Sequence, residues 1–411
     1  MDKIIKRNVA VEGVSLLTTN DNVATANLTI GPRYHKCIAQ VVATAAANKI
    51  LTVADMMGLI NIKIGGKPQR QHTATELDRV YQCYGEDYRV RLYNYDAGHV
   101  WFVGANYTGG AGLATQRIVG AGNNDLTVTP AITNGVITAL AVVAGGTAYK
   151  VGDTFSITDS TGTGAYGTVL TVNAGAVLTC SVTNPSSLVL QGPVAGKQTI
   201  AFIPMHFTEP WRQSYASRQQ FSWPTAWENG FALPSFQIEF TIPKATANIN
   251  SGQPYTLILW SETDSQLGLA PNGKPVQNIV RWSRLNMPYA GAGDNYFYDP
   301  SPTDIELERT FFCQPGDDIS NIIVSVDSRI VRDCSKDIND QTLIENGWNR
   351  NSLDPDIFTL CFDYSDLPTD GLALGVNGVS VKEYFIKYTL GAAAAASKLI
   401  QTVTQRYGPI Q

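Results

Sequence analysis

The chain has 411 residues, of which 44% are hydrophobic and 16% charged, and its formal net charge is −5. This composition predicts a folded protein with room for two or three domains and excludes a disordered chain. The negative charge argues against nucleic acid as a direct partner, because phosphate binding requires a basic surface. No apolar run reaches the roughly 18 residues that a membrane-spanning helix needs.

The N-terminal residues 1–20 are predicted to form an arm that precedes the first domain. Its tip interleaves the basic residues Lys3, Lys6 and Arg7 with two isoleucines. Such a tip is either a frayed terminus or an arm that reaches an anionic surface such as a layer of lipid headgroups. A long apolar run and a small-residue cleavage site are both missing, so we do not expect a secretory signal.

Residues 21–247 are predicted to form a first β domain. Apolar and polar residues alternate in several short segments, which indicates half-buried strands. These segments are 22–30, 34–44, 59–64, 199–207 and 235–242. One helix lies among them, because Thr73 and Glu76 form a capping box ahead of LDRVYQCY. Gly85 follows at the position of a C-terminal helix cap.

A charge-poor segment, residues 106–196, interrupts this first domain. Its 91 residues carry only five charged side chains and 15 of the chain's 36 glycines. The chain-wide charge density would give about three times as many charges, which marks a boundary. The segment also contains an internal repeat, because NGVITALAV (134–142) resembles AGAVLTCSV (174–182) at an offset of 40 residues. We therefore predict an inserted Gly-rich β module made of two related units packed face to face.

Residues 253–389 are predicted to form a second β domain of similar size, after a polar linker. Its strand-like segments are short and bounded by Gly, Pro, Asn or Asp, which is typical of a sandwich or barrel of antiparallel strands. They are YTLILWSE, QNIVRWSRL, ERTFFCQPGDDISNIIVSV, DIFTLCFDY and KEYFIKYTL. Residues 390–411 are predicted to be helical, because alanine has the highest helix propensity and Gly408-Pro409 ends the run.

The sequence predicts no catalytic centre, no cofactor and no metal site. The four histidines, His35, His72, His99 and His206, lie far apart, and there is no nucleophile elbow. GTGAYG (162–167) matches a dinucleotide-binding pattern, but a strand-like TVLTV follows where a helix is required, so a Gly-rich turn explains it better. The six widely spaced cysteines indicate reduced, mostly buried thiols in a protein made in the cytoplasm.

Acidic residues gather in the second domain, mainly at Asp317-Asp318 and between Asp333 and Asp340. A calcium site at residues 337–340 is the alternative to a solvated loop, but the EF-hand spacing and its distal Glu are missing. We favour the solvated loop. No two carboxylates stand out as the pair that a glycoside hydrolase needs.

A corner rich in tryptophan and proline follows the inserted module. Trp211, Trp223 and Trp227 lie within it. Exposed indole rings would stack on sugars, whereas buried ones would anchor a corner between strands or a subunit contact. The neighbouring Pro210 and Phe221 are themselves packing residues, so we favour the packing role.

Four segments resemble the major coat proteins of icosahedral bacteriophages with an internal membrane, of the tectivirus and corticovirus type. INIKIGGKPQRQHTATELDRVYQCYG resembles a strand, turn and flanking helix of the first barrel in such coats. TIAFIPMHFTEPWR and ALPSFQIEFTIP resemble the closing strands of that barrel, and YTLILWSETD resembles the entry into the second one.

The resemblance implies an all-β fold of two tandem eight-stranded jelly-roll barrels, with the inserted small β domain and a few short helices. It also implies a homotrimer that packs as a pseudo-hexagonal capsomer in a virion capsid, with residues 106–196 as an outer tower. The implied partners are neighbouring capsomers, penton, minor and membrane proteins of the capsid, and inner membrane lipid. The resemblance transfers no catalytic residue and no cofactor.

Two other function classes stay open at this point. A phage spike or receptor-binding protein would use the Gly-rich module as an adhesin, and a few dozen copies per particle would distinguish it from a coat. A jelly-roll glycan-binding protein or enzyme would need an acid pair or a tryptophan platform in one cleft.

Overall fold

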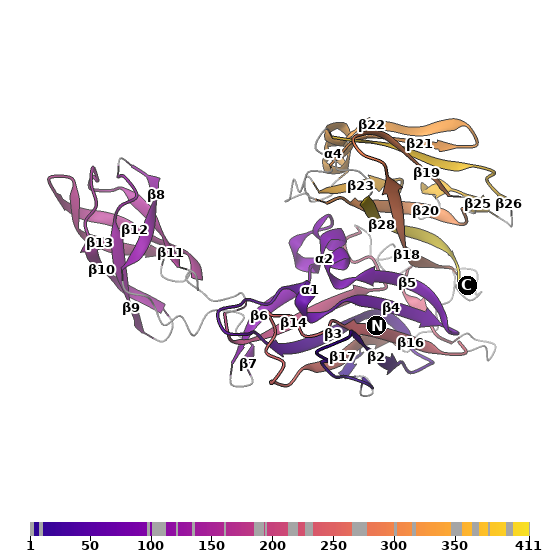
Figure 1. Ribbon diagram of the computed structural model, residues 1–411, viewed down its shortest axis with the longest axis horizontal. Helices are drawn as coiled ribbons and strands as arrows, with labels where there is room; N and C mark the ends of the chain where they lie inside the picture. The colour runs from indigo at the N-terminus through magenta and orange to yellow at the C-terminus, as the bar shows by residue number, and fades with distance from the viewer. Residues whose placement is uncertain are drawn as a thin grey trace.

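A computed structural model of the chain shows three β bodies, two large ones in contact and a small one set apart from them (Figure 1). The structure describes residues 4–7, 11–96, 99–100, 112–120, 122–133, 136–159, 162–184, 193, 195–212, 221–226, 233–264, 278–299, 302–314, 318–346, 356–363, 370–376, 379–391 and 398–410.

The first body, barrel one, consists of two sheets with the strand orders β1-β17-β3-β14 and β2-β16-β4-β5. In chain order these are the first, eighth, third and sixth strands, and the second, seventh, fourth and fifth. This is the two-sheet Greek-key arrangement of a jelly roll. The strands are β1 (Ile4–Arg7), β2 (Asn22–Asn27), β3 (Arg33–Thr44), β4 (Leu59–Ile64), β5 (Lys67–Thr73), β14 (Gln198–His206), β16 (Phe236–Ile242) and β17 (Thr256–Asp264).

Burial alternates along these strands as the sequence predicts. In β16 the buried positions Phe236, Ile238, Phe240 and Ile242 face the core, and polar residues lie between them. The alternation fixes the register, because a slip by one residue would expose all four side chains.

Shorter elements complete barrel one. The predicted helix is confirmed as α2 (Ala74–Gln82), with the capping box between Thr73 and Glu76 in place. The remaining elements are β6 (Arg91–Asp96), β7 (His99–Val100), β15 (Trp223–Pro224), α1 (Val53–Met56) and the 3-10 turn η1 (Glu86–Tyr88). Helix α1 was not predicted, although Thr52 and Asp55 form a second capping box at its start.

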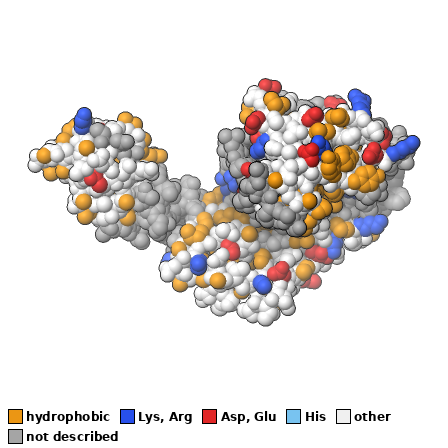
Figure 2. All heavy atoms as spheres, turned by 45° about the horizontal axis from the view of Figure 1, so that its top comes forward, with side chains coloured by type: hydrophobic (Ala, Val, Ile, Leu, Met, Phe, Trp, Pro, Cys, Tyr) orange, Lys and Arg blue, Asp and Glu red, His pale blue; other side chains and the backbone are white. Residues whose placement is uncertain are grey.

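The charge-poor segment contains a sheet of its own, with the order β10-β9-β8-β11-β12-β13. Its strands are β8 (Leu113–Val119), β9 (Thr127–Thr133), β10 (Val136–Ala144), β11 (Thr154–Asp159), β12 (Gly162–Asn173) and β13 (Ala176–Asn184). The predicted repeat relates β10 to β13, since β13 starts and ends 40 residues after β10. Each of the two units has three strands, β8 to β10 and β11 to β13. The two units enclose a separate core that includes Val128, Ile137, Phe155 and Val177. Figure 2 shows few charged side chains on the visible face of this module.

The second large body, barrel two, repeats the strand order of barrel one. Its sheets run β18-β28-β20-β23 and β19-β27-β21-β22, again first-eighth-third-sixth and second-seventh-fourth-fifth. The strands are β18 (Asn278–Tyr289), β19 (Gly293–Asp299), β20 (Ile305–Phe312), β21 (Ile319–Val326), β22 (Arg329–Ser335), β23 (Ile357–Cys361), β27 (Tyr384–Leu390) and β28 (Lys398–Pro409). Smaller elements are α4 (Lys336–Glu345), β24 (Leu372–Ala373), β25 (Gly375–Val376) and β26 (Val379–Ser380). The chain therefore has the double jelly-roll fold.

The N-terminal and central domain boundaries differ from the predicted ones. Residues 1–20 were predicted to be an arm, but Ile4–Arg7 forms β1, which pairs with β17 as the first strand of barrel one. The second domain was predicted to start at residue 253, but β17 pairs along its whole length with β3. The last strand of barrel one closes next to the first, so the polar linker at 244–254 lies within barrel one instead of between barrels.

The helix predicted for residues 390–411 is wrong. Lys398–Pro409 forms β28, which pairs with β18 on one side and β20 on the other. Its β-branched residues Ile400, Thr402, Val403 and Thr404 favour a strand, and two paired neighbours override any helix propensity. The alanine run itself falls outside the described residues.

The solvated loop predicted at residues 337–340 is also wrong, because this segment lies in α4. Ser335 caps the helix by accepting a hydrogen bond from the Ile338 amide. Asp340 lies 3.2 Å from the Lys336 ammonium one helical turn earlier. GTGAYG (162–167) is likewise part of β12 and not a turn.

Removal of residues 106–196 is expected to leave both barrels folded. The β6–β7 hairpin precedes the module and β14 follows it; β6 and β14 pair antiparallel and meet at Tyr95 and Gln198, so a short loop can replace the insert. Circular dichroism and urea unfolding of the deletion variant should match the full chain. A control deletion of 398–409 removes a central strand and should abolish cooperative unfolding; loss of folding in the module deletion would contradict this view.

Candidate functional site

The two barrels meet in a buried interface, and this interface is the candidate functional site. Barrel one contributes β5, α2 and the corner after β14, and barrel two contributes β18, β20, β23 and β28 (Figure 1). Trp282, Phe312, Ile357 and Val403 of barrel two belong to the same hydrophobic cluster as the core of barrel one. The packing is thus continuous from one barrel into the other.

Arg70, on β5, lies at the centre of this interface and is 3% exposed. Its Nη1 donates a hydrogen bond to the His206 carbonyl of barrel one, and its Nε donates to the Val280 carbonyl of barrel two, 3.1 Å away. The guanidinium also lies over the rings of Phe207 and Trp282, and its Cζ atom is 5.3 Å from each ring centroid. Burial lowers the pKa of Arg70 to about 10, so it stays charged at neutral pH.

Arg70 also marks the point where the sheets of the two barrels join. It is paired with Trp282 in a parallel bridge between β5 and β18. His72 packs edge-on against Trp282, with ring centroids 5.2 Å apart. Burial and the nearby Arg70 charge lower the pKa of His72 to about 3, so this imidazole is neutral.

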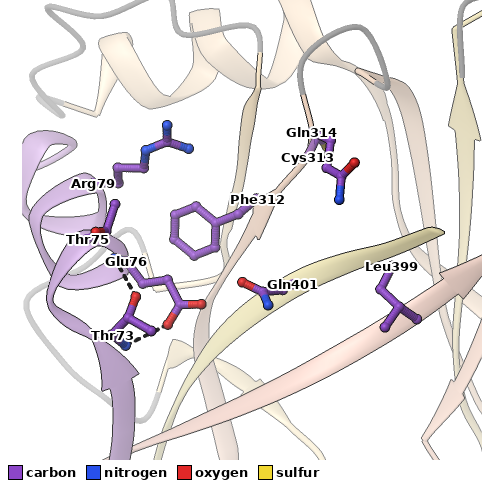
Figure 3. A pocket seen from close by; sticks show the side chains of 9 residues that line it. All are labelled: Thr73, Thr75, Glu76, Arg79, Phe312, Cys313, Gln314, Leu399 and Gln401. Carbon is purple, nitrogen blue, oxygen red and sulfur yellow. Dashed lines mark hydrogen bonds between the residues drawn. The ribbon is translucent and has the colours of Figure 1, made fainter. Parts of the chain in front are cut away.

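Helix α2 adds an ion pair across the interface. Glu76 caps the helix and also accepts a hydrogen bond from Arg284 of β18, at 2.8 Å. Beside it, a groove of about 530 Å³ separates α2 from β20 and β28. Figure 3 shows Arg79 and Phe312 on the two sides of this groove, with Gln401 at its base.

A polar cluster continues the contact beyond the helix. Trp211 stacks on Tyr84 with ring centroids 4.0 Å apart and an interplanar angle of 3°. The Tyr84 hydroxyl donates to Glu308 of β20. Gln405 of β28 donates to both of these groups, at 3.1 Å each. Burial and the adjacent Glu308 carboxylate raise the pKa of Tyr84, which therefore remains a donor at neutral pH.

Arg212 connects the ends of the two sixth strands. It forms an ion pair with Glu209, three residues after β14. It forms a second ion pair, at 2.5 Å, with Asp363, two residues after β23. Burial raises the pKa of Asp363 to about 6 despite this ion pair. Its Oδ1 atom is buried and has no hydrogen-bond partner among the described residues, so the carboxylate is only partly compensated.

The tryptophan corner is distributed over the interior. Trp223 is 1% exposed and packs on Phe207 and Phe236 in the core of barrel one. Trp211 is half-buried and belongs to the interface. Trp227 lies outside the described residues. Because Trp223 is enclosed by core residues, it cannot serve as a platform for a sugar.

The predicted basic tip lies at the opposite edge of barrel one. Lys6 and Arg7 are exposed on β1, where they pair in register with Ser261 and Trp260. Lys3 lies outside the described residues. The structure therefore brings neither basic residue near the tryptophan corner or the interface.

The interface residues Arg70, Arg212, Glu308, Asp363 and Gln405 were not singled out in the sequence. A charged residue inside an alternating strand is the signal that could have found Glu308, because a half-buried strand keeps charge on its solvent face. The uncharged Gln405 gives no such signal. Their partners come from segments far apart in the chain, which no local pattern reveals.

The described part of the chain holds no group of metal ligands, no disulfide and no membrane-spanning helix. The described residues contain no group of three or more His, Cys, Asp or Glu side chains that could hold a metal ion. All six cysteines are free, and five of them are buried. No helix among the described residues has the length and apolarity needed to cross a membrane.

No family model matches the chain, and no curated protein matches it. Among solved structures, the chain is similar to the major capsid protein P2 from bacteriophage PM2, with a TM-score of 0.54 and 10% identity over 100% of this chain and 98% of that one. It is also similar to the major capsid protein of STIV, with a TM-score of 0.50 and 8% identity over 100% and 97% of the two chains. The Faustovirus major capsid protein matches with a TM-score of 0.50 and 10% identity over 100% and 90%. These similarities establish the fold: the two barrels form the double jelly roll of those proteins.

Arg70→Lys is expected to destabilise the contact between the barrels. A lysine ammonium cannot reach both the His206 and Val280 carbonyls or stack flat on the aromatic rings. The loss of hydrogen bonds from a buried charged group should cost at least about 2 kcal/mol. Urea unfolding should show a lower midpoint or two separate transitions, whereas the control Arg329→Lys, at an exposed position of β22, should match wild type. Equal midpoints for both variants would show that Arg70 does not couple the barrels.

Asp363→Asn is expected to flatten the pH dependence of stability. Because the folded-state pKa of Asp363, about 6, lies above its usual 3.8, the folded protein binds this proton more tightly than the unfolded chain. The resulting stabilisation is present below pH 3.8 and is lost as the pH rises through 6. This difference amounts to roughly 3 kcal/mol at most.

Urea unfolding between pH 4 and 7 measures this effect. The wild type should lose stability over that range relative to Asp363→Asn, and a control variant at the exposed Asp87 should follow the wild type. Parallel pH profiles for wild type and Asp363→Asn would contradict the raised pKa.

Proposed function

We propose that the protein is the major capsid protein of an icosahedral virus and has a structural, non-enzymatic role in the virion capsid. One observation carries the proposal: a single chain holds two jelly rolls with the same strand order, joined through a buried interface. The full-length similarity to the major capsid protein P2 of bacteriophage PM2 supports it.

The joined barrels suit a shell-forming unit. Two similar barrels in fixed contact form a block, and three such blocks around an axis place six barrels in a ring with near-hexagonal outline. A hexagonal outline tiles a shell with the same contacts on every side. We therefore propose a homotrimer as the capsomer, with neighbouring capsomers, penton and minor or membrane proteins of the capsid as its further partners.

We place the module of residues 106–196 on the outer surface of the capsomer as a tower. It has its own core, it lies apart from the barrels (Figure 1), and it enters between the fifth and sixth strands of barrel one. We further propose that the exposed Lys6 and Arg7 of β1 contact an anionic surface such as the lipid of an internal membrane.

Purified protein is expected to form trimers that assemble into larger shells. Light scattering coupled to size exclusion gives the oligomeric state, and negative-stain microscopy gives the shape of the assemblies. In particles, the protein should be present in hundreds of copies. A strictly monomeric protein that never assembles, or a few dozen copies per particle, would argue against a coat and for a spike.

A further inference from the structure

The two barrels repeat one local structure where the fifth strand ends. In barrel one, β5 ends at Thr73, which is the N-cap of α2. In barrel two, β22 ends at Ser335, which is the N-cap of α4. An arginine precedes each cap at the same spacing, Arg70 in barrel one and Arg332 in barrel two.

The two arginines also make the same contacts. Each donates a hydrogen bond to the carbonyl of the last residue of the sixth strand, at 2.5 Å from Arg70 and 2.9 Å from Arg332. Each guanidinium lies over the phenylalanine that follows, 5.3 Å from the Phe207 ring centroid and 5.7 Å from that of Phe362. Helices α2 and α4 are therefore equivalent and can be aligned residue by residue.

The equivalent helix faces differ in what covers them. Glu76 of α2 is 5% exposed, because it faces barrel two and binds Arg284. The aligned residue of α4 is Ile338, which is 62% exposed. Gln341, aligned with Arg79 beside the groove, is also exposed. Barrel two thus presents an uncovered helix face at the position where barrel one makes its contact.

The surface that would receive this face can be found by the same equivalence. Within the chain, α2 contacts the first-eighth-third-sixth sheet of barrel two, and the equivalent sheet in barrel one is β1-β17-β3-β14. Its outward side carries Ile38 and Gln40 of β3, Phe202 of β14, and Ile258 and Trp260 of β17, all half-buried. We call these five residues the outer face of barrel one.

Strand register brings these side chains together. Gln40 pairs with Phe202 on one side and Ile258 on the other, and Ile38 pairs with Trp260. The Trp260 indole donates a hydrogen bond to the Gln40 side chain, at 2.9 Å, which fixes the ring on the sheet. A rigid tryptophan among aliphatic side chains is the composition of a protein–protein contact.

We propose that the Ile338 face of α4 docks on the outer face of barrel one in a second copy of this chain. The contact repeats between chains the one that α2 makes with barrel two within a chain. If each step turns by about 60°, three chains close a ring of six barrels. The inference rests on the proposed trimer and names the surfaces that hold it together.

The chemistry of the faces agrees with this pairing. Within the chain, the polar Glu76 meets Arg284. Between chains, the apolar Ile338 would meet Trp260 and Ile258. The Glu76 face of α2 therefore matches the sheet of barrel two, and the Ile338 face of α4 matches the outer face of barrel one. This difference specifies the order of barrels around the ring.

Ile338→Asp tests the proposal. The side chain is exposed in the single chain and an acidic residue is favourable in the first turn of a helix, so the variant should fold. It should be monomeric by light scattering at concentrations where wild type is trimeric, with an unchanged far-ultraviolet circular dichroism spectrum. The matched control is Tyr296→Asp, at a 57% exposed position on β19, and it should stay trimeric. β19 and β22, the strand that leads into α4, are the two edges of the sheet β19-β27-β21-β22.

A second measurement tests the position of the contact. The double variant Ile338→Cys, Ile258→Cys treated with a short bismaleimide should give covalently linked trimers on a denaturing gel, and neither single variant should. Trimers that persist in Ile338→Asp without cross-linking of the double variant would overturn this inference and leave the proposed coat function standing. A wild-type chain that never forms trimers would instead count against the proposed function itself.

Discussion

The arrangement of the two barrels depends on one buried positive charge. Arg70 lies in an apolar interface, where an uncompensated guanidinium would be costly. Two carbonyls, one from each barrel, accept its hydrogen bonds, and aromatic rings from both barrels cover its faces. Because the Val280 carbonyl and the Trp282 ring come from barrel two, any rotation of one barrel against the other would remove part of this compensation. The contact thus makes a rigid block out of two domains.

Arg332 makes the equivalent contacts in barrel two. It ties the fifth strand of barrel two to the end of the sixth, as Arg70 does in barrel one. The arginine is therefore first a part of each jelly roll, where it holds the strand that leads into the helix. In barrel one it has an additional partner, the Val280 carbonyl of barrel two. In barrel one this repeated structural element therefore also connects the two repeats.

The local features of the fold could be predicted from the sequence, and the long-range ones could not. Alternation located most strands, and the Thr73–Glu76 capping box located α2, because both depend only on neighbouring residues. The membership of β17 and β28 depends on strands far away in the chain, so β17 was assigned to the wrong barrel and β28 to a helix. The class of fold was predicted from the resemblance of several segments to known coat proteins, and not from any functional site.

The interface residues escaped prediction for the same reason. Arg212 binds Glu209 and Asp363, which follow equivalent strands of different barrels. Asp363 lies 151 residues after Arg212 in the chain, so no local pattern connects them. The corner tryptophans were recognised as packing residues, but their different locations, Trp223 in a core and Trp211 in an interface, follow from tertiary contacts.

The Glu76–Arg284 ion pair within a chain and the apolar Ile338 at the equivalent exposed position differ for a physical reason. Two barrels on one chain are held at a high effective concentration, so their contact can use ion pairs that give specificity and little net binding energy. Separate chains must also overcome the loss of translational and rotational freedom, which apolar burial around an aromatic anchor can offset. A chain that carries Glu76 at one helix face and Ile338 at the equivalent one is therefore built to close its internal contact first and its external contacts afterwards. In the proposed trimer this order would keep single chains folded before they associate.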